Sequence, residues 1–250
     1  MSSSLRYSQV GFSYGDAPCI EGFSCRLQRG ELVGLIGANG SGKSTLLRLG
    51  AGLLAPSRGQ VLLDARPVQS WRGHERASRL GYLPQSIEVP LPFRVGELVT
   101  MGRAAARRAI SLAGDEALQL VGLANHRETP LDRLSGGERR RAFLAMTLAQ
   151  GGTTLLLDEP LAGLDLRYQY ELLALLRQLC REQGLTVMLS LHDLLLAREL
   201  DRLLVVRQGQ LLADGLPSEL LQPELICRTF DLDGAVQWSA LWQAGKNRAV

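Results

Sequence analysis

Residues 37–45 read GANGSGKST, a glycine-rich stretch that ends in a lysine and two hydroxyl residues. It fits the phosphate-loop pattern G-x-x-x-x-G-K-[ST], in which a glycine-rich turn joins a buried strand to a helix. The fixed positions of the pattern are Gly37, Gly42, Lys43 and Ser44. The apolar residues 32–36 before the loop predict the strand, and the leucines within residues 46–49 predict the helix. Both flanks therefore favour a phosphate loop over a glycine-rich turn that carries a solvated lysine.

Each residue type in this loop has a physical task in binding a nucleoside triphosphate. Glycines let the backbone come close to a phosphate, so that successive N–H groups point inward at the start of the helix. Lys43 would place a positive charge between the β and γ phosphates, and the Ser44 hydroxyl would be a ligand of Mg²⁺. The residues expected to bind the nucleotide are Gly37, Ala38, Asn39, Gly40, Ser41, Gly42, Lys43, Ser44 and Thr45.

The composition is that of a globular protein. Hydrophobic residues make up 46% and charged residues 21% of the 250 residues, which argues against a disordered chain. A formal net charge of +3 is too small to indicate a nucleic-acid partner. No apolar run approaches the roughly 20 residues that span a bilayer, and the N-terminus lacks the apolar segment of a secretory signal. We therefore expect the chain to stay in the cytosol.

The cysteines are scattered along the chain, without C-x-x-C spacing and without a histidine nearby at metal-binding spacing. They are Cys19, Cys25, Cys180 and Cys227. This distribution predicts reduced structural thiols rather than disulfides or a zinc site.

The opening residues 5–27 alternate short apolar and polar runs that break at Gly15, Asp16 and Pro18. This pattern predicts antiparallel strands joined by a turn. Tyr14 lies just before the turn. Its ring can stack on an adenine or pack at the end of a strand, and the spacing alone does not decide between the two.

Two acidic residues close the continuous apolar run at residues 153–157. Asp158 matches the residue that holds Mg²⁺ in phosphate-loop proteins, and Glu159 adjoins it at the position that polarises an attacking water. A pair of solvated acids in a turn is the alternative. The phosphate loop in the same chain favours the catalytic interpretation.

Gln85 and His192 follow two further apolar runs, residues 80–83 and 186–191. Both residues therefore fall at the carboxyl edge of a predicted sheet, where open α/β proteins bind their ligands. Gln85 can coordinate Mg²⁺ or position a water, and a neutral His192 can donate to a γ phosphate. A solvated glutamine and a structural histidine are the alternatives.

Residues 134–138 read LSGGE and open a long helical pattern. Ser135 and Glu138 fit the capping box S-x-x-E, which is a local helix-starting signal. Capping does not explain Gly136 and Gly137, because glycine is a poor helix former. In the first turn the pair exposes backbone N–H groups at the positive end of the helix dipole, which predicts a second phosphate site.

The phosphate loop, LSGGE, the run LLLDEP at residues 155–160 and SLHD at residues 190–193 together resemble the ATP-binding subunits of ABC transporters. The resemblance extends over nearly the whole chain, and LSGGE separates it from ordinary kinases and GTPases. It implies an α/β fold with a RecA-like phosphate-loop core, an N-terminal antiparallel β layer and an inserted α-helical subdomain. The expected division is residues 1–85 and 151–230 for the core, 86–150 for the helical subdomain with LSGGE, and 231–250 for a C-terminal tail.

The resemblance also implies roles for individual residues. In that family two nucleotide domains pair head to tail, and each ATP lies between one subunit's phosphate loop and the other's LSGGE helix. The residues implied to meet ATP in trans are Leu134, Ser135, Gly136, Gly137 and Glu138. Further implied roles are adenine stacking for Tyr14, sensing of Mg²⁺ and the membrane partner for Gln85, Mg²⁺ binding for Asp158, water polarisation for Glu159, dimer contact for Asp165 and γ-phosphate contact for His192.

Two positions depart from the commonest family pattern. Arg140 stands in place of a frequent glutamine, and Thr154 in place of a frequent aliphatic residue. Neither change removes a functional group, so the sequence still predicts ATP hydrolysis, with ATP and Mg²⁺ as cofactors.

The implied function is that of a separate ATPase subunit of an importer, peripheral on the cytoplasmic face of the inner membrane. Its expected partners are a second copy of itself, transmembrane permease subunits and, indirectly, a solute-binding protein. Residues 91–103, LPFRVGELVTMGR, resemble importers of iron-siderophore complexes, haem and vitamin B12, although the same apolar positions would serve a plain helix core. Zinc or manganese import and a soluble ABC ATPase outside transport are the alternatives, and LSGGE argues against a small-molecule kinase.

Overall fold

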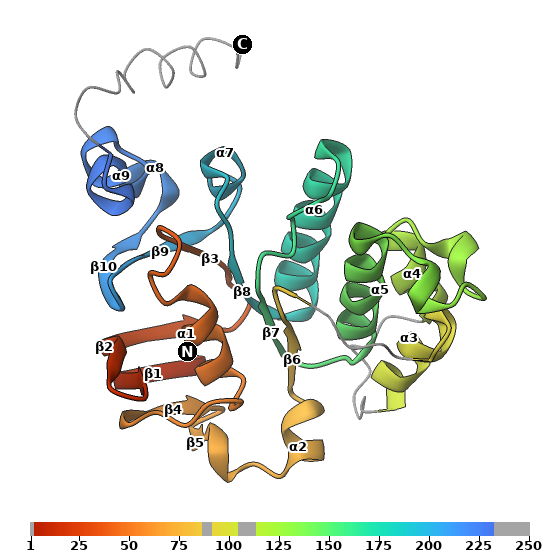
Figure 1. The fold of residues 1–250 in the computed structure, drawn as a ribbon, viewed down its shortest axis with the longest axis horizontal. Coiled ribbons are helices and arrows are strands. Elements are labelled where there is room, and N and C mark those ends of the chain that lie inside the picture. Colours follow the sequence, from red (N-terminus) through yellow and green to blue (C-terminus); the bar gives the residue numbers. More distant parts are fainter. Residues whose placement is uncertain (1–2, 87–91, 105–113, 233–250) are drawn as a thin grey trace.

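The computed structural model describes residues 3–86, 92–104 and 114–232. These residues form two β-sheets, with a helix between the sheets, further helices around the larger sheet and a helical group at one side (Figure 1). Leu91, the first residue of the importer-like segment, and the expected tail after Leu232 lie outside the described residues.

The larger sheet has the strand order β10-β9-β3-β8-β7-β6. Its strands are β3 (Leu32–Ile36), β6 (Leu80–Leu83), β7 (Thr154–Leu157), β8 (Thr186–Ser190), β9 (Arg202–Arg207) and β10 (Gln210–Gly215). Neighbouring strands are parallel except in the β9–β10 hairpin. Every residue of β3, β7 and β8 is buried, because the strands of a parallel sheet are covered on both faces.

Helices cover both faces of this sheet. They are α1 (Lys43–Gly50), α6 (Leu166–Gln183), α7 (Leu194–Ala197), α8 (Pro217–Leu220) and α9 (Pro223–Phe230). Val33 and Leu35 of β3 pack in one apolar cluster with the leucines of α1, whereas Leu32 and Ile36 belong to a second cluster with the leucines of α6. Successive side chains of a strand point to opposite faces, so β3 contributes to both halves of the core.

The smaller sheet is the antiparallel layer expected at the N-terminus. Its order is β2-β1-β4-β5, with β1 (Ser3–Tyr14), β2 (Ala17–Gln28), β4 (Arg58–Leu63) and β5 (Arg66–Pro67). Strands β1 and β2 form a hairpin that turns at Gly15 and Asp16. Tyr7 and Phe23 are buried against α1, and the Tyr7 hydroxyl donates to the Leu46 carbonyl at 2.9 Å. Helix α1 is therefore held between the two sheets.

A group of helices lies in the chain between β6 and β7. It contains α3 (Val95–Ala104), α4 (Gly114–Leu120) and α5 (Gly136–Ala149), with 3-10 turns at Ala124–His126 and Leu131–Arg133. The link from β5 to β6 carries a 3-10 turn at Val68–Ser70 and α2 (Gly73–Ala77). Val99, Leu118 and Leu144 are buried in the apolar cluster that also lines the larger sheet. Because this core is continuous, the division of the chain at residues 86 and 150 stays a prediction.

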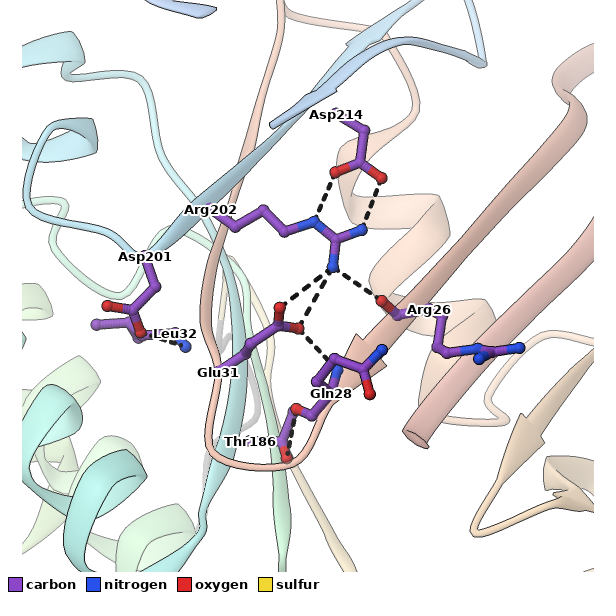
Figure 2. A network of polar contacts seen from close by, with 8 residues as sticks. All are labelled: Arg26, Gln28, Glu31, Leu32, Thr186, Asp201, Arg202 and Asp214. Atoms are coloured by element: carbon purple, nitrogen blue, oxygen red, sulfur yellow. Dashed lines mark hydrogen bonds and ion pairs between the residues drawn. The ribbon is translucent and has the colours of Figure 1, made fainter. Parts of the chain in front are cut away.

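A network of charged side chains joins the two sheets (Figure 2). Arg202 at the start of β9 binds both carboxylate oxygens of Asp214 at 2.6 Å each. Its third nitrogen donates to the Arg26 carbonyl of β2 at 3.0 Å and to Glu31 at 3.3 Å. These ion pairs and hydrogen bonds raise the pKa of Arg202. Since Glu31 precedes β3 and the phosphate loop follows it, the network holds the end of the strand opposite the phosphate loop.

Candidate nucleotide-binding and catalytic site

The phosphate loop joins the carboxyl end of β3 to the first residue of α1. A Cβ atom on Gly37 would lie 2.2 Å from the Val206 carbonyl oxygen, so the close contact with β9 requires glycine. Gly42 has a φ of 102°, which side chains disfavour. It also occupies the N-cap of α1, where its lack of a side chain leaves the first N–H groups of the helix for an anion.

Lys43 is buried at the start of α1. Its ammonium donates to the carbonyls of Gly37 at 2.7 Å and Ala38 at 2.9 Å, so the charge is held over the loop. Burial lowers the pKa of Lys43, and the nearby carboxylates of Glu159 and Asp158 oppose that shift. A partly desolvated cation in this position suits a phosphate group.

Asp158 follows β7 and is 1% exposed. Its Oδ1 atom accepts a hydrogen bond from the Ser190 hydroxyl at 2.7 Å. Its Oδ2 atom is buried and has no hydrogen-bond partner among the residues that the structure describes. A buried carboxylate oxygen that lacks a protein donor is a suitable ligand for a hard cation such as Mg²⁺. Asp158 therefore fits the metal site expected from the sequence.

Glu159 contacts two side chains that follow the strands on either side of its own strand. Its Oε1 atom lies 2.9 Å from the Gln85 amide nitrogen and 2.7 Å from Nε2 of His192. Gln85 follows β6, Glu159 follows β7 and His192 follows β8, and these strands are parallel neighbours. The carboxyl edge of the larger sheet thus brings Gln85 and His192 into direct contact with Glu159, and these are the three proposed catalytic side chains.

A cavity of about 160 Å³ opens beside this cluster and is lined in part by Glu159, Gln169 and His192. Each water molecule occupies about 30 Å³ in the liquid, so the cavity has room for water next to the Glu159 carboxylate. The arrangement supplies a carboxylate to accept a proton from water and two polar side chains to orient that carboxylate.

Tyr14 ends β1, and the residue is 48% exposed. It makes an edge contact with Phe12, with ring centroids 4.8 Å apart, and its hydroxyl lies 3.4 Å from Oγ1 of Thr45 in α1. The ring is therefore partly free and next to the helix of the phosphate loop. This placement is compatible with adenine stacking, and the role stays a prediction.

LSGGE begins helix α5, with Leu134 buried and Ser135 at the N-cap. The Ser135 hydroxyl accepts from the Glu138 N–H at 3.3 Å, and Glu138 accepts from the Ser135 N–H at 2.9 Å. The capping box is thus present. The Ser135 hydroxyl also donates to Oε2 of Glu138 at 2.8 Å, and this hydrogen bond together with that from the Ser135 N–H lowers the pKa of Glu138. Gly136 is exposed, and Gly137 lies against the turn at Gly163. Figure 1 shows α5 and α1 on opposite sides of strands β6 and β7.

Asp165 is the N-cap residue of α6 and is exposed, with no side-chain capping hydrogen bond. It ends the turn that follows Glu159 and contains Gly163. Asp165 is thus on the surface, two residues after Gly163, which lies against Gly137 of α5. Its expected contact with a second subunit stays a prediction.

The site also contains Ser190 and Arg140, which the motif analysis did not assign to it. Ser190 ends β8 and binds both Asp158, as above, and the Glu159 N–H at 2.8 Å. Its signal in the sequence was a hydroxyl at the end of an otherwise buried strand. Arg140 extends from α5, and its Nη2 atom donates to the Asp158 carbonyl at 2.6 Å. Its signal in the sequence is an arginine at a position where glutamine is frequent in the family.

A phosphate loop after the parallel strand β3, an acidic pair after β7 of the same sheet and an antiparallel sheet over α1 define a phosphate-loop nucleotide-binding protein. The sequence profile of the family described as ABC transporter matches residues 20–162. The chain belongs to this family.

Two curated relatives show how far the similarity extends. The hemin import ATP-binding protein HmuV of Rhodopseudomonas palustris (strain BisA53) is 44% identical over 247 residues, covering 95% of this chain and 91% of the relative. The ferric enterobactin transport ATP-binding protein FepC of Escherichia coli (strain K12) is 39% identical over 236 residues, covering 91% of this chain and 87% of the relative.

Solved structures share the fold. A bacterial Atm1-family ABC exporter with ATP bound matches with a TM-score of 0.80 and 27% identity over 94% of this chain, which spans 43% of that longer chain. The cbiO1 protein from Clostridium perfringens, part of the ABC transporter complex cbiONQ, matches with a TM-score of 0.74 and 27% identity over 97% of this chain and 100% of that chain. Within the described residues, no helix is long and apolar enough to cross a bilayer.

Proposed function

We propose that this protein is the ATP-hydrolysing subunit of an ABC importer that drives uptake of hemin or another iron chelate through a separate transmembrane permease. The observation that carries the proposal is the contact of Gln85, Glu159 and His192 beside Asp158 and the phosphate loop. The cargo class rests on the similarity to hemin and ferric enterobactin import proteins over more than nine-tenths of the chain.

In the proposed reaction, the N–H groups of residues 37–45 and the ammonium of Lys43 bind the phosphates of ATP. Ser44 and Asp158 would hold Mg²⁺, which neutralises negative charge on the phosphates when bound. Glu159 accepts the proton of the attacking water, while Gln85 and His192 orient its carboxylate. Tyr14 stacks on the adenine. Because a neutral imidazole has a single N–H, His192 would donate it to the γ phosphate in place of Glu159 when ATP is bound.

The proposed partners follow from the position of LSGGE. LSGGE begins α5, and α5 lies on the opposite side of β6 and β7 from α1 in Figure 1, so a second copy of the chain would supply the N–H groups of LSGGE to the shared ATP. Closure of this dimer around ATP and its reopening after hydrolysis move the permease. The subunit would then sit on the cytoplasmic face of the membrane, with Gln85 near the permease and a solute-binding protein acting from outside.

A reconstitution experiment tests the function and the cargo together. The protein, its co-encoded permease and its solute-binding protein are placed in proteoliposomes, and ATP-dependent uptake of hemin, ferric siderophores, cobalamin and free zinc is measured. We expect uptake of hemin or another iron chelate, and the Glu159→Gln variant should abolish it. Uptake of zinc alone would refute the cargo class, and ATP hydrolysis that drives no uptake would favour an ABC ATPase outside transport.

A further inference from the structure

The peptide group between Asp158 and Glu159 is held at both ends by side chains from other elements. Arg140 of α5 donates from Nη2 to the Asp158 carbonyl oxygen at 2.6 Å. Ser190 of β8 accepts from the Glu159 N–H at 2.8 Å. The Ser190 hydroxyl also binds Oδ1 of Asp158 at 2.7 Å, so one hydroxyl contacts both acids. The orientation of this peptide is therefore set from two sides.

This peptide needs such support because Glu159 has a φ of 51°. A left-handed backbone conformation is unfavourable for a residue with a Cβ atom, and it persists only where the surrounding structure over-determines it. The rotation of the peptide plane decides where the Glu159 side chain leaves the backbone. A change in that plane would move the carboxylate away from Gln85 and His192.

The surroundings of Arg140 indicate that its guanidinium is placed for this contact. The residue is partly buried, and its Nε atom has no hydrogen-bond partner among the described residues. Burial lowers the pKa of Arg140, and the carboxylates of Glu159 and Asp158 oppose that shift. A desolvated cation costs stability unless its surroundings compensate for it. Here the compensation comes from the turn that carries Asp158 and Glu159, called the catalytic turn below.

We propose that Arg140 is a positioning residue for Glu159, which it acts on through the Asp158 carbonyl. Because Arg140 lies on the helix that begins with LSGGE, it also connects that helix to the catalytic turn of the same chain. A shift of α5 when LSGGE engages a nucleotide is then passed to the peptide that orients Glu159. The inference rests on the proposed role of Glu159 in hydrolysis.

The test compares Arg140→Met, Arg140→Lys and a control, Arg177→Met, in the full chain. Methionine keeps much of the apolar side chain but removes the donors, whereas lysine keeps a cationic donor of similar reach. Arg177 is a close match for Arg140, because its Nη2 also donates to a main-chain carbonyl, that of Glu199, and its Nε is also buried without a partner among the described residues. It lies on α6, and its hydrogen bonds and ion pair within the described part of the chain go to Glu199 and not to Asp158 or Glu159.

We expect Arg140→Met to lower kcat for ATP by about tenfold or more, because small displacements of a catalytic group are costly, while the Kd for Mg-ATP stays within about twofold. Arg140→Lys should recover most of the loss, and Arg177→Met should keep the wild-type kcat. Hydrogen exchange of the peptide that covers residues 153–160 gives a second readout. Arg140→Met should speed exchange there in the nucleotide-free protein, and Arg177→Met should not.

Combining Arg140→Met with Glu159→Gln distinguishes a positioning role of Arg140 from a general loss of structure, because the effects of the two substitutions on kcat should then not add. Since Arg140 acts through Glu159, adding Arg140→Met to Glu159→Gln should lower the residual kcat by less than about twofold. Wild-type kcat in Arg140→Met, unchanged exchange, or a fully additive double variant would each overturn the inference. If Glu159→Gln abolishes turnover while Arg140→Met does not affect it, only this inference fails. If Glu159→Gln itself turns over normally, the proposed function fails.

Discussion

His192 lies with its Nε2 atom 2.7 Å from Oε1 of Glu159, although the two residues are 33 positions apart in the sequence. They meet because β7 and β8 are parallel neighbours that end at the same edge of the larger sheet. Gln85 reaches the same oxygen from the end of β6, on the other side of β7. The position of this one carboxylate oxygen therefore depends on the alignment of three strands.

Glu159→Gln should retain ATP binding and lose at least about 99% of turnover, because an amide keeps the shape of the side chain without serving as a base. Nucleotide binding and phosphate release are measured on the same preparation. Loss of binding together with normal turnover per bound ATP would contradict the role of Glu159 as the base.

Lys43→Ala should lower ATP turnover by at least about a hundredfold, because it removes a preorganised positive charge from the phosphates. Phosphate release with saturating Mg-ATP measures this effect, and a melting curve checks that the variant is folded. The assignment of the phosphate loop fails if Lys43→Ala is folded and hydrolyses ATP at the wild-type rate.

ATP should make the Glu159→Gln variant dimerise, and Ser135→Arg should abolish the dimer by placing a bulky side chain where LSGGE meets the nucleotide. Light scattering with Mg-ATP measures the molar mass. The matched control is Ser218→Arg, which changes an exposed serine near the start of the distant helix α8. A dimer that persists with Ser135→Arg would refute the shared-site geometry.

Arg202→Ala should lower the free energy of unfolding by about 2 kcal/mol, because it leaves Asp214 and Glu31 without their shared cationic partner. Urea unfolding measures the change. Arg167→Ala is the control, since its ion pair with Glu171 is on the exposed surface of α6, and it should leave the midpoint unchanged. Equal effects of the two substitutions would contradict the role of the network in joining the sheets.

Alkylation at pH 8 should distinguish the cysteines. Burial raises the pKa of Cys180 to about 12 and also raises that of Cys25, so their reactive thiolate forms are scarce at this pH. Cys19 and Cys227 are partly exposed and should react first. The Cys19 thiol lies 3.4 Å from Oγ1 of Thr45, so ATP should protect Cys19 but not Cys227. Mass spectrometry of labelled peptides measures this, and equal protection of both would argue against nucleotide binding at Thr45.

The parts of this protein that could be predicted from the amino-acid sequence are those whose signals are local. The strand before the phosphate loop, the helix after it, the hairpin at the N-terminus and the capping box at Ser135 each depend on residues close together in the chain. Hydrophobic periodicity, glycine placement and capping act over a few residues, which is why these elements could be predicted. The family followed from the motifs, because LSGGE and the phosphate loop occur together.

How these elements meet depends on contacts between residues that are far apart in the chain. The order β10-β9-β3-β8-β7-β6 brings Gln85, Glu159 and His192 together, and no local pattern encodes which strands become neighbours. The left-handed backbone of Glu159 and the two side chains that hold its peptide, Ser190 and Arg140, depend on contacts between β7, β8 and α5. A serine at the end of a strand and an arginine on a helix each have many possible hydrogen-bond partners. The packing of the sheet against α5 gives Ser190 and Arg140 the same partner, the peptide group between Asp158 and Glu159.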